Sequence, residues 1–372
     1  MVDLNAQYEK LGCEIDTAIK SVLKSAAFIK GPEVTRFEDD LKIYLGIDHV
    51  ISCANGTDAL QIAMMALGLK PGDEVITTDF TFISTVEVVA LLGLKLVLVD
   101  PDPDTFNISS GAVKEAITSR TRAIVPVHLF GQCADMESIM TMAKEHDLFV
   151  IEDTAQATGA DYFFSDGSIK KAGTIGIIGT TSFFPSKNLA CYGDGGALFT
   201  GDEALAKKIR SIANHGMKIK YHHDFIGINS RLDTLQAAIL NVKLRYLDRF
   251  NESRKKLADF YDKALAECRS VIQPVRVPYS SHIFHQYTLR VKNGRRDELR
   301  KYLESTKIPS MVYYPEPLHV QNAYRYLGYF EDDFPVTSQL CNEVLCLPMH
   351  PDMEQEQADY IIQHILQFFE KQ

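Results

Sequence analysis

The chain has 372 residues, of which 46% are hydrophobic and 24% are charged, and it carries a net charge of −10. These values are typical of a globular protein with room for two domains, and the acidic balance argues against general binding to nucleic acid or to an anionic membrane. Seven scattered cysteines, without a CxxC pair or a Cys/His cluster, indicate neither a disulfide framework nor a metal site.

The N-terminal segment is predicted to form a helix over residues 6–24. The chain begins with MVDLNAQYEK, which lacks the basic region and apolar run of a secretory signal. No apolar stretch in the sequence is long enough to cross a membrane. We therefore expect a cytoplasmic protein.

The middle of the chain alternates strand patterns with helix patterns. Residues 49–69 pass from a short apolar run, through Asn-Gly-Thr, into a helical pattern, and residues 73–93 repeat this order. Further buried strands are predicted within 95–109, 122–131 and 148–160, with a helix over 134–147 between the last two. Strands that alternate with helices of this length predict an α/β fold with a mainly parallel sheet.

The C-terminal third is organised differently from the middle of the chain. Its predicted elements are a long amphipathic helical stretch over 232–267, a strand over 285–292, a helix over 297–306, a loop over 313–324 and a final helix near 355–369. We interpret residues 25–249 as a large domain and residues 250–372 as a small α/β domain. The N-terminal helical segment, residues 1–24, is expected to pack on the small domain.

Candidate functional residues follow the predicted strands, because ligands of open α/β sheets bind at the carboxyl ends of the strands. These candidates are Asn55 to Thr57, Phe80 to Phe82, His128, Asp153 with Gln156, and the segment from Ser182 to Lys187.

The Gly56-Thr57 pair opens a helix directly after a strand. The first backbone N–H groups of a helix lack intrahelical partners and lie at the positive end of its dipole, which suits a phosphate. The Ser182 hydroxyl would bind the same anion. Taken alone, however, Thr57 is better explained as an ordinary helix N-cap.

Asp153 ends one apolar strand, and Phe82 follows another. The carboxylate would lie near the active edge of the sheet with Gln156 close by, and the aromatic ring would stack on a planar ligand. In isolation, a turn or cap role for Asp153 and a core position for Phe82 are the commoner explanations.

Lys187 stands among apolar residues in TSFFPSKNLACYGDGGALFT, residues 181–200. Burial lowers the pKa of a lysine and favours a nucleophilic role. The alternative, favoured by roughly four to one for a lone lysine, is a stem that packs on apolar surface while the amine reaches water.

Taken together, the candidates supply phosphate donors, a stacking aromatic ring, a carboxylate and a lysine. These are the groups needed to hold pyridoxal phosphate, in the chain order of the aspartate-aminotransferase-like fold. A lysine forms a Schiff base with its aldehyde, and a carboxylate pairs with the pyridinium nitrogen so that the ring acts as an electron sink.

Several long motifs add a resemblance to this interpretation, among them NGTDALQIA, PGDEVITTDFTFIST, VPVHLFGQCADM, IEDTAQATGA, TSFFPSKNLACYGDGGALFT and GINSRLDTLQAAIL. Through them the chain resembles the DegT/DnrJ/EryC1/StrS family of nucleotide-sugar aminotransferases over nearly its whole length. The resemblance implies an α/β fold of the fold-type I pyridoxal-phosphate-dependent transferases, with a large cofactor-binding domain and a small C-terminal domain.

The resemblance also implies a role for each candidate residue. Lys187 would be the Schiff-base lysine, Asp153 would face the pyridinium nitrogen, Gln156 would lie near the phenolic oxygen, Phe82 would stack on the ring, and Gly56, Thr57 and Ser182 would hold the phosphate. Asn229 would reach the phosphate from the partner subunit, which implies a homodimer with composite active sites. Without the resemblance, Asn229 and Arg231 are explained as loop and cap residues.

Within the family, the chain is most similar to aminotransferases that act on UDP-2-acetamido-2-deoxy-3-oxo-glucuronate for surface polysaccharides such as lipopolysaccharide. L-Glutamate would be the amino donor. Arg231 would bind the sugar carboxylate, because a guanidinium binds carboxylates in bidentate fashion. Tyr221, His222 and His223 would line the sugar or diphosphate site, with a solvated loop as the alternative, and Tyr313 lies in a loop expected to touch substrate.

Other functions remain open at this point. A sugar dehydratase on the same cofactor would carry histidine in place of Lys187. A nicotinamide oxidoreductase needs a GxGxxG turn, which is missing, and a ligand sensor would need a partner domain. The nearest alternative is an aminotransferase for a different 3-keto or 4-keto deoxysugar nucleotide.

Overall fold

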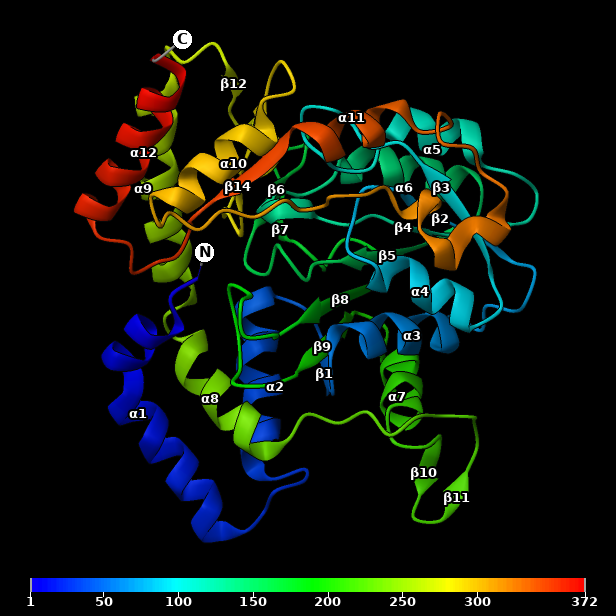
Figure 1. Ribbon diagram of the computed structural model, residues 1–372. Coiled ribbons are helices and arrows are strands. Elements are labelled where there is room, and N and C mark those ends of the chain that lie inside the picture. The colour runs from blue at the N-terminus through cyan, green and yellow to red at the C-terminus, as the bar shows by residue number, and fades with distance from the viewer. Residues whose placement is uncertain (1, 371–372) are drawn as a thin grey trace.

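The computed structural model describes residues 2–370, and a seven-stranded sheet forms its centre (Figure 1). The strand order is β1-β9-β8-β5-β4-β2-β3, in which β9 runs antiparallel to both of its neighbours and the remaining pairs are parallel. The strands are β1 (His49–Cys53), β2 (Glu74–Thr78), β3 (Lys95–Val99), β4 (Thr121–Val125), β5 (Phe149–Asp153), β8 (Ile178–Ser182) and β9 (Gly196–Thr200). The predicted α/β fold with a mainly parallel sheet is confirmed.

Helices cover both faces of this sheet, so its strands are buried on both sides. In β2, for example, Val75 belongs to one apolar core and the next residue, Ile76, belongs to the other. The first core is completed by α3 (Gly56–Leu67), α4 (Ser84–Leu91) and α7 (Glu203–Ile212), and the second by α5 (Ser110–Ala116) and α6 (Met136–Glu145).

A third core lies beside β1 and β9, where α2 (Pro32–Leu45) packs on α8 (Thr234–Leu244). Short elements complete this part of the chain. They are η1 (Leu129–Gly131), β6 (Asp161–Phe163), β7 (Ile169–Lys171), β10 (Met217–Ile219) and β11 (His222–His223).

The long helical stretch predicted over 232–267 is formed by two helices, α8 and α9 (Leu247–Leu265). The break falls at Arg245 and Tyr246, where no proline or glycine marks it. Tyr246 stacks on Phe250 and donates a hydrogen bond from its hydroxyl to Glu14 at 2.6 Å. Tertiary contacts with the N-terminal helix thus accompany a break that the local sequence does not signal.

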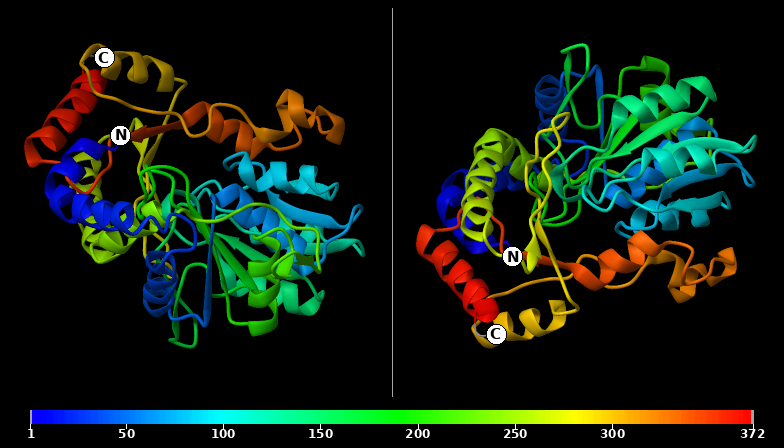
Figure 2. Two further views of the ribbon diagram at one scale, coloured as in Figure 1. Left: turned by 90° about the horizontal axis from the view of Figure 1, so that it is seen from below. Right: turned by 90° about the horizontal axis from the view of Figure 1, so that it is seen from above.

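The small domain packs α9, α10 (Arg296–Ser305) and α12 (Gln355–Glu370) around a three-stranded antiparallel sheet. Its strands are β12 (Val271–Ile272), β13 (Tyr287–Val291) and β14 (Val344–Leu347). Between α10 and β14 the chain returns over the large domain through η2 (Leu318–Val320), η3 (Asn322–Leu327) and α11 (Pro335–Glu343), which Figure 2 shows from below and from above.

The N-terminal helix α1 (Leu4–Ser25) packs chiefly on α8, through a cluster that joins Leu11 and Ile15 to Ile239 and Val242 (Figure 1). It also approaches the small domain, because Lys10 forms an ion pair with Asp352 at 2.8 Å. The boundaries of the two domains stay a prediction. Among residues 2–370, no helix is both long enough and apolar enough to span a membrane.

Candidate active site

A cavity of about 650 Å³ lies at the carboxyl ends of β2, β5 and β8, and it contains eight of the predicted site residues. These residues are Gly56, Thr57, Phe82, Asp153, Gln156, Ser182, Lys187 and Tyr313. They come from five separate segments of the chain. The carboxyl ends of neighbouring parallel strands meet at one edge of the sheet, and this explains why the residues lie together.

Lys187 lies in the loop between β8 and β9, and its stem is partly buried. Its backbone N–H donates to the Phe184 carbonyl at 2.8 Å, which closes a turn, and Phe183 and Leu189 on either side are buried in the core beside β9. Burial lowers the pKa of the Lys187 amine to about 8, and the nearby Asp153 carboxylate opposes this shift. A substantial fraction of neutral amine is therefore present near neutral pH.

Asp153, at the end of β5, is held in one orientation. Its Oδ2 accepts from the Thr85 hydroxyl at 2.8 Å, and its Oδ1 accepts from the Ala155 N–H at 3.1 Å. The side chain is buried yet lines the cavity. An oriented carboxylate of this kind can hold a proton on a ligand nitrogen.

Gln156 lines the cavity and forms a hydrogen bond to a loop that is distant in the sequence. Its Oε1 accepts from the Phe130 N–H at 2.9 Å, and its Nε2 donates to the Tyr314 hydroxyl at 3.1 Å. The amide is therefore fixed on both sides, and the second bond crosses from the large domain to the segment that follows α10.

The first turn of α3 carries the predicted phosphate-binding residues Gly56 and Thr57. Asn55 is the residue that caps this helix, because its Oδ1 accepts from the Asp58 N–H at 2.8 Å; the predicted alternative, a Thr57 cap, is wrong. The Thr57 hydroxyl instead pairs with the Ser84 hydroxyl at 2.7 Å. A Cβ added to Gly56 would lie 2.7 Å from the Ser182 Cβ, so the two phosphate-binding candidates approach each other as closely as glycine allows.

Phe82 is 54% exposed although it follows a buried strand. Its ring lies 6.5 Å from that of Tyr314, and both rings line the cavity. Phe82 therefore does not occupy the core position that is more common for phenylalanine. An exposed ring beside an oriented carboxylate, a helix N-terminus and a lysine fits a planar, phosphorylated cofactor.

The sequence analysis missed several residues that line this cavity, most notably Tyr314 and His285. His285 donates from Nδ1 to Asn188 Oδ1 at 3.0 Å, because the Asn188 amide nitrogen is committed to Asn251 Oδ1 at 2.7 Å. Burial, followed by the charges of Lys187 and Arg254, lowers the pKa of His285 well below its usual value. Asn188 could have been found from the sequence, because it directly follows Lys187. His285 stands just before β13 and Tyr314 follows another tyrosine, and neither position indicates a residue of the cavity.

Five residues to which the resemblance gives roles do not line the cavity of this chain. Asn229 pairs with Asn214 through a backbone bridge, and Arg231 donates to Asn214 Oδ1 at 3.0 Å. Tyr221, His222 and His223 belong to the exposed hairpin of β10 and β11, which projects from the body of the protein in Figure 1. Their roles stay a prediction.

His128, another strand-end candidate, is fully buried outside the cavity. Its ring bridges Glu152 Oε2 at 2.9 Å and the Ala134 N–H at 3.1 Å. Burial raises the pKa of Glu152, but His128 and the backbone N–H groups of Gly173 and Gly176 outweigh it, so the pKa lies below its usual value. Because Nδ1 accepts from Ala134, Nε2 carries the ring proton and donates to the Glu152 carboxylate, so the contact is a buried hydrogen bond.

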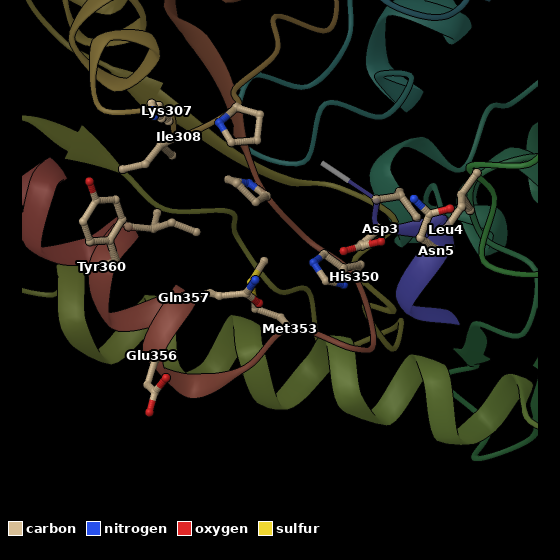
Figure 3. A pocket seen from close by; sticks show the side chains of 14 residues that line it. Asp3, Leu4, Asn5, Lys307, Ile308, His350, Met353, Glu356, Gln357 and Tyr360 are labelled. Atoms are coloured by element: carbon tan, nitrogen blue, oxygen red, sulfur yellow. The ribbon is translucent and has the colours of Figure 1, made fainter. Parts of the chain in front are cut away.

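A second cavity of about 730 Å³ lies between the start of α1 and the small domain (Figure 3). Asp3, Lys307, His350 and Tyr360 are among its lining residues, and none of the predicted site residues is there. The described part of the chain contains no group of three or more His, Cys, Asp or Glu side chains that could hold a metal ion.

Comparisons with known proteins place these features in a family. The chain is 48% identical to a pleiotropic regulatory protein of Geobacillus stearothermophilus, over 99% of this chain and 98% of that protein. It is 45% identical to UDP-2-acetamido-2-deoxy-3-oxo-D-glucuronate aminotransferase of Pseudomonas aeruginosa, over 95% of each. It is 40% identical to dTDP-3-amino-3,4,6-trideoxy-alpha-D-glucose transaminase of Streptomyces venezuelae, over 100% of this chain and 96% of that enzyme.

Solved structures agree with the sequence relatives. The crystal structure of S. venezuelae DesV in complex with a ketimine intermediate matches with a TM-score of 0.95 and 40% identity, over 99% of this chain and 97% of that one. NtdA of Bacillus subtilis, solved with the bound cofactor PMP, matches with a TM-score of 0.88 and 32% identity, over 98% and 82%. A family model matches residues 9–366, and the chain belongs to the DegT/DnrJ/EryC1/StrS aminotransferase family.

Proposed function

We propose that this aminotransferase moves the amino group of L-glutamate to the C3 ketone of a sugar nucleotide. The substrate we propose is UDP-2-acetamido-2-deoxy-3-oxo-glucuronate, and its 3-amino product would serve surface polysaccharide synthesis. The observation that carries the proposal is the combination, in one cavity, of Lys187 with a lowered pKa, the oriented Asp153 and the N-terminus of α3. Pyridoxal phosphate is the cofactor of the family, and these residues fit it.

The residues of this chain divide the binding of the cofactor between them. The free N–H groups at the start of α3, with Thr57 and Ser182, would hold the phosphate, and Phe82 would cover one face of the ring. Asp153, oriented by Thr85, would hold a proton on the ring nitrogen. When bound, pyridoxal phosphate supplies an aldehyde and a ring that withdraws electrons from the carbon bearing the amino group.

Lys187 performs two tasks in this proposal. Burial supplies a neutral amine, which would hold the cofactor covalently through its aldehyde. When it is free, the same amine would act as the base and acid that moves a proton from the donor α-carbon, and it would return a proton to the sugar carbon. His285, which stays neutral, adds no competing positive charge beside it.

Two relatives support amination at C3. The P. aeruginosa and S. venezuelae enzymes differ in nucleotide and in the rest of the sugar, but both names place the ketone or the new amine at C3. The glucuronate assignment also rests on Arg231, whose guanidinium suits the sugar carboxylate. We further propose that Arg231 and Asn229 act in the active site of the partner subunit of a homodimer, since neither lines the cavity of its own chain.

The substrate can be tested with the reverse half-reaction. The holoenzyme is mixed with the UDP-linked 3-amino-2-acetamido uronic acid, without keto acid, and the visible absorbance of the bound cofactor is followed. A 4-amino-4,6-dideoxy sugar nucleotide is the parallel sample, and Lys187→Ala is the control variant. Bleaching by the first compound alone supports the proposal. Bleaching by the second alone overturns the substrate, and no response to any amino sugar would favour a regulatory role like that named for the G. stearothermophilus relative.

The composite site can be tested by mixing two inactive variants. Lys187→Ala and Asn229→Ala are unfolded and refolded together, so that half of the dimers contain one chain of each. In a composite arrangement, one of the two sites in such a dimer has both Lys187 and Asn229, which restores about a quarter of the wild-type activity. If no activity returns, Asn229 does not act across a subunit interface.

A further inference from the structure

The segment that returns over the large domain, residues 309–343, is here named the strap. It leaves the small domain after α10 and rejoins it at β14, and in Figure 1 its orange ribbon crosses the region of β2, β3 and α4. Leu318, Tyr324 and Phe334 of the strap are buried in the same core as α3 and α4. The strap is therefore docked by apolar contact, but apolar contact alone does not fix its register.

A buried pair, Asp79 and His319, supplies a directional contact. Asp79 directly follows β2, and its Oδ1 accepts from the His319 backbone N–H at 2.8 Å. Its Oδ2 lies 2.6 Å from His319 Nδ1, and both side chains are completely buried. His319 Nε2 has no partner, which assigns the ring proton to Nδ1 and makes the ring a donor to Asp79.

Asp100 provides a second anchor of the same kind. It directly follows β3, the neighbour of β2, and its Oδ1 accepts from both the backbone N–H and the hydroxyl of Thr337, at 2.9 and 2.8 Å. Its Oδ2 accepts from the Val336 N–H at 3.1 Å. Carboxylates after two adjacent strands thus bind the strap rather than a ligand.

Between the small domain and these anchors, the strap passes along the cavity. Tyr313 and Tyr314 line it, and the Tyr314 hydroxyl accepts from Gln156. The Tyr314 ring also packs edge-on against Phe80, with ring centroids 5.8 Å apart, and Phe80 is the residue directly after Asp79. A shift of His319 relative to Asp79 would therefore move the two tyrosines relative to the cavity wall.

We propose that Asp79 and His319 are positioning residues of the active site: their buried pair fixes the strap so that Tyr313 and Tyr314 form the wall that the sugar nucleotide contacts. This inference rests on the proposed function for the identity of the ligand. Neither residue lines the cavity, and the groups proposed to hold the cofactor phosphate and the ring nitrogen come from other segments of the chain. The consequence of loosening the pair is a selective loss of binding of the keto sugar nucleotide.

The test uses Asp79→Asn in the holoenzyme. Burial raises the pKa of Asp79 to about 6, with His319 opposing the rise, so the wild-type side chain is a carboxylate at an assay pH of about 8. Both oxygens of Asp79 accept hydrogen bonds from His319, and in asparagine an NH₂ group would replace one of them and face an N–H donor. The alternative tautomer would place an N–H on the buried, partnerless Nε2, so the pair loosens.

We expect faster hydrogen exchange over residues 313–337 and a KM for the keto sugar nucleotide raised about tenfold. The KM for L-glutamate and the absorbance of bound cofactor should change less than about twofold. The single variant His319→Asn keeps Asp79 as the acceptor and a donor near the Nδ1 position, so it should retain most of the sugar affinity. The matched control is Glu74→Gln at the other end of β2, where a buried carboxylate pairs with Lys95 and Arg120 at 3.0 and 2.8 Å; it should lower stability without affecting strap exchange or sugar KM.

Each result decides a separate statement. Unchanged exchange in Asp79→Asn overturns the anchor, and faster exchange with an unchanged sugar KM overturns the positioning role. Equal effects of Asp79→Asn and Glu74→Gln on sugar KM would show a general loss of stability and would also overturn it. A wild-type enzyme that transaminates no sugar nucleotide refutes the proposed function, and in that case the exchange comparison still decides whether the pair anchors the strap.

Discussion

The amine of Lys187 offers the most direct test of the site, because its predicted reactivity follows from its surroundings. Burial lowers its pKa from 10.5 to about 8, so at pH 7 the neutral fraction is about 300-fold larger than for a free lysine side chain, since ten to the power 2.5 is about 300. We predict that apoprotein captures pyridoxal phosphate at a rate that rises about tenfold per pH unit up to about pH 8 and then levels off. Asp153→Asn should move the plateau to lower pH, because the Asp153 carboxylate raises the pKa of Lys187.

The assay is stopped-flow absorbance of cofactor capture between about pH 7 and 10, with N-acetyl-lysine as the reference amine. Reduction with borohydride and peptide mapping then locate the label. Lys243 is a control within the same chain: burial lowers its pKa to about 8 as well, but it is 1% exposed and lies 4.3 Å from the centre of the Tyr192 ring, outside the cavity. Lys243→Met should leave the pH profile unchanged.

Two results would refute this reasoning. A wild-type rate that continues to rise toward pH 10, as the reference amine does, would show that the Lys187 environment does not supply neutral amine. Label on Lys243 would show that a lowered pKa alone, without the cavity, is sufficient for capture.

Three further predictions concern Gly56, the buried Glu152 and the sugar. Gly56→Ala should weaken cofactor binding about tenfold or more in an absorbance titration, because its Cβ would meet Ser182 at 2.7 Å. Glu152→Gln should lower the free energy of unfolding by about 3 kcal/mol at pH 7, measured with urea, because the buried carboxylate accepts hydrogen bonds from His128 and from three backbone N–H groups. Because the folded pKa of Glu152 is depressed, this difference should be complete above its unfolded pKa of about 4.5 and disappear as pH falls through the folded value. Arg231→Lys should raise the KM of the uronate sugar about tenfold and leave that of a neutral sugar nucleotide unchanged.

Much of the fold and the centre of the site follow from local sequence. Apolar runs ending in polar residues located the ends of β2 and β5, and the geometry of parallel strands then requires Phe82 and Asp153 to lie at one edge. The assignment of a cofactor needed their combination with Lys187, since each residue taken alone had a more common structural explanation. Whether Asn229 and Arg231 act in a partner's site is a question about an assembly that one chain does not contain.

Other features depend on contacts between distant segments. Tyr314 reaches the cavity only because the strap folds back from the small domain, and Asn188 orients His285 across nearly a hundred residues of sequence. Thr85 lies on a helix predicted correctly, but its bond to Asp153 depends on how that helix packs. Hydrogen bonds of this kind are set by tertiary packing, which periodicity does not encode.

Three aspartates at equivalent places in the sheet show why position alone does not assign a function. Asp79, Asp100 and Asp153 each stand at the carboxyl end of a parallel strand, where a ligand-binding carboxylate is expected. Backbone and side-chain donors from the strap occupy both oxygens of Asp79 and of Asp100. Asp153 receives one hydroxyl and one backbone N–H, yet it alone of the three lines the cavity. The same residue type at the same edge thus anchors a segment where the chain covers it and is open to a ligand where the chain leaves space, so the path of the strap decides which carboxylate is available for chemistry.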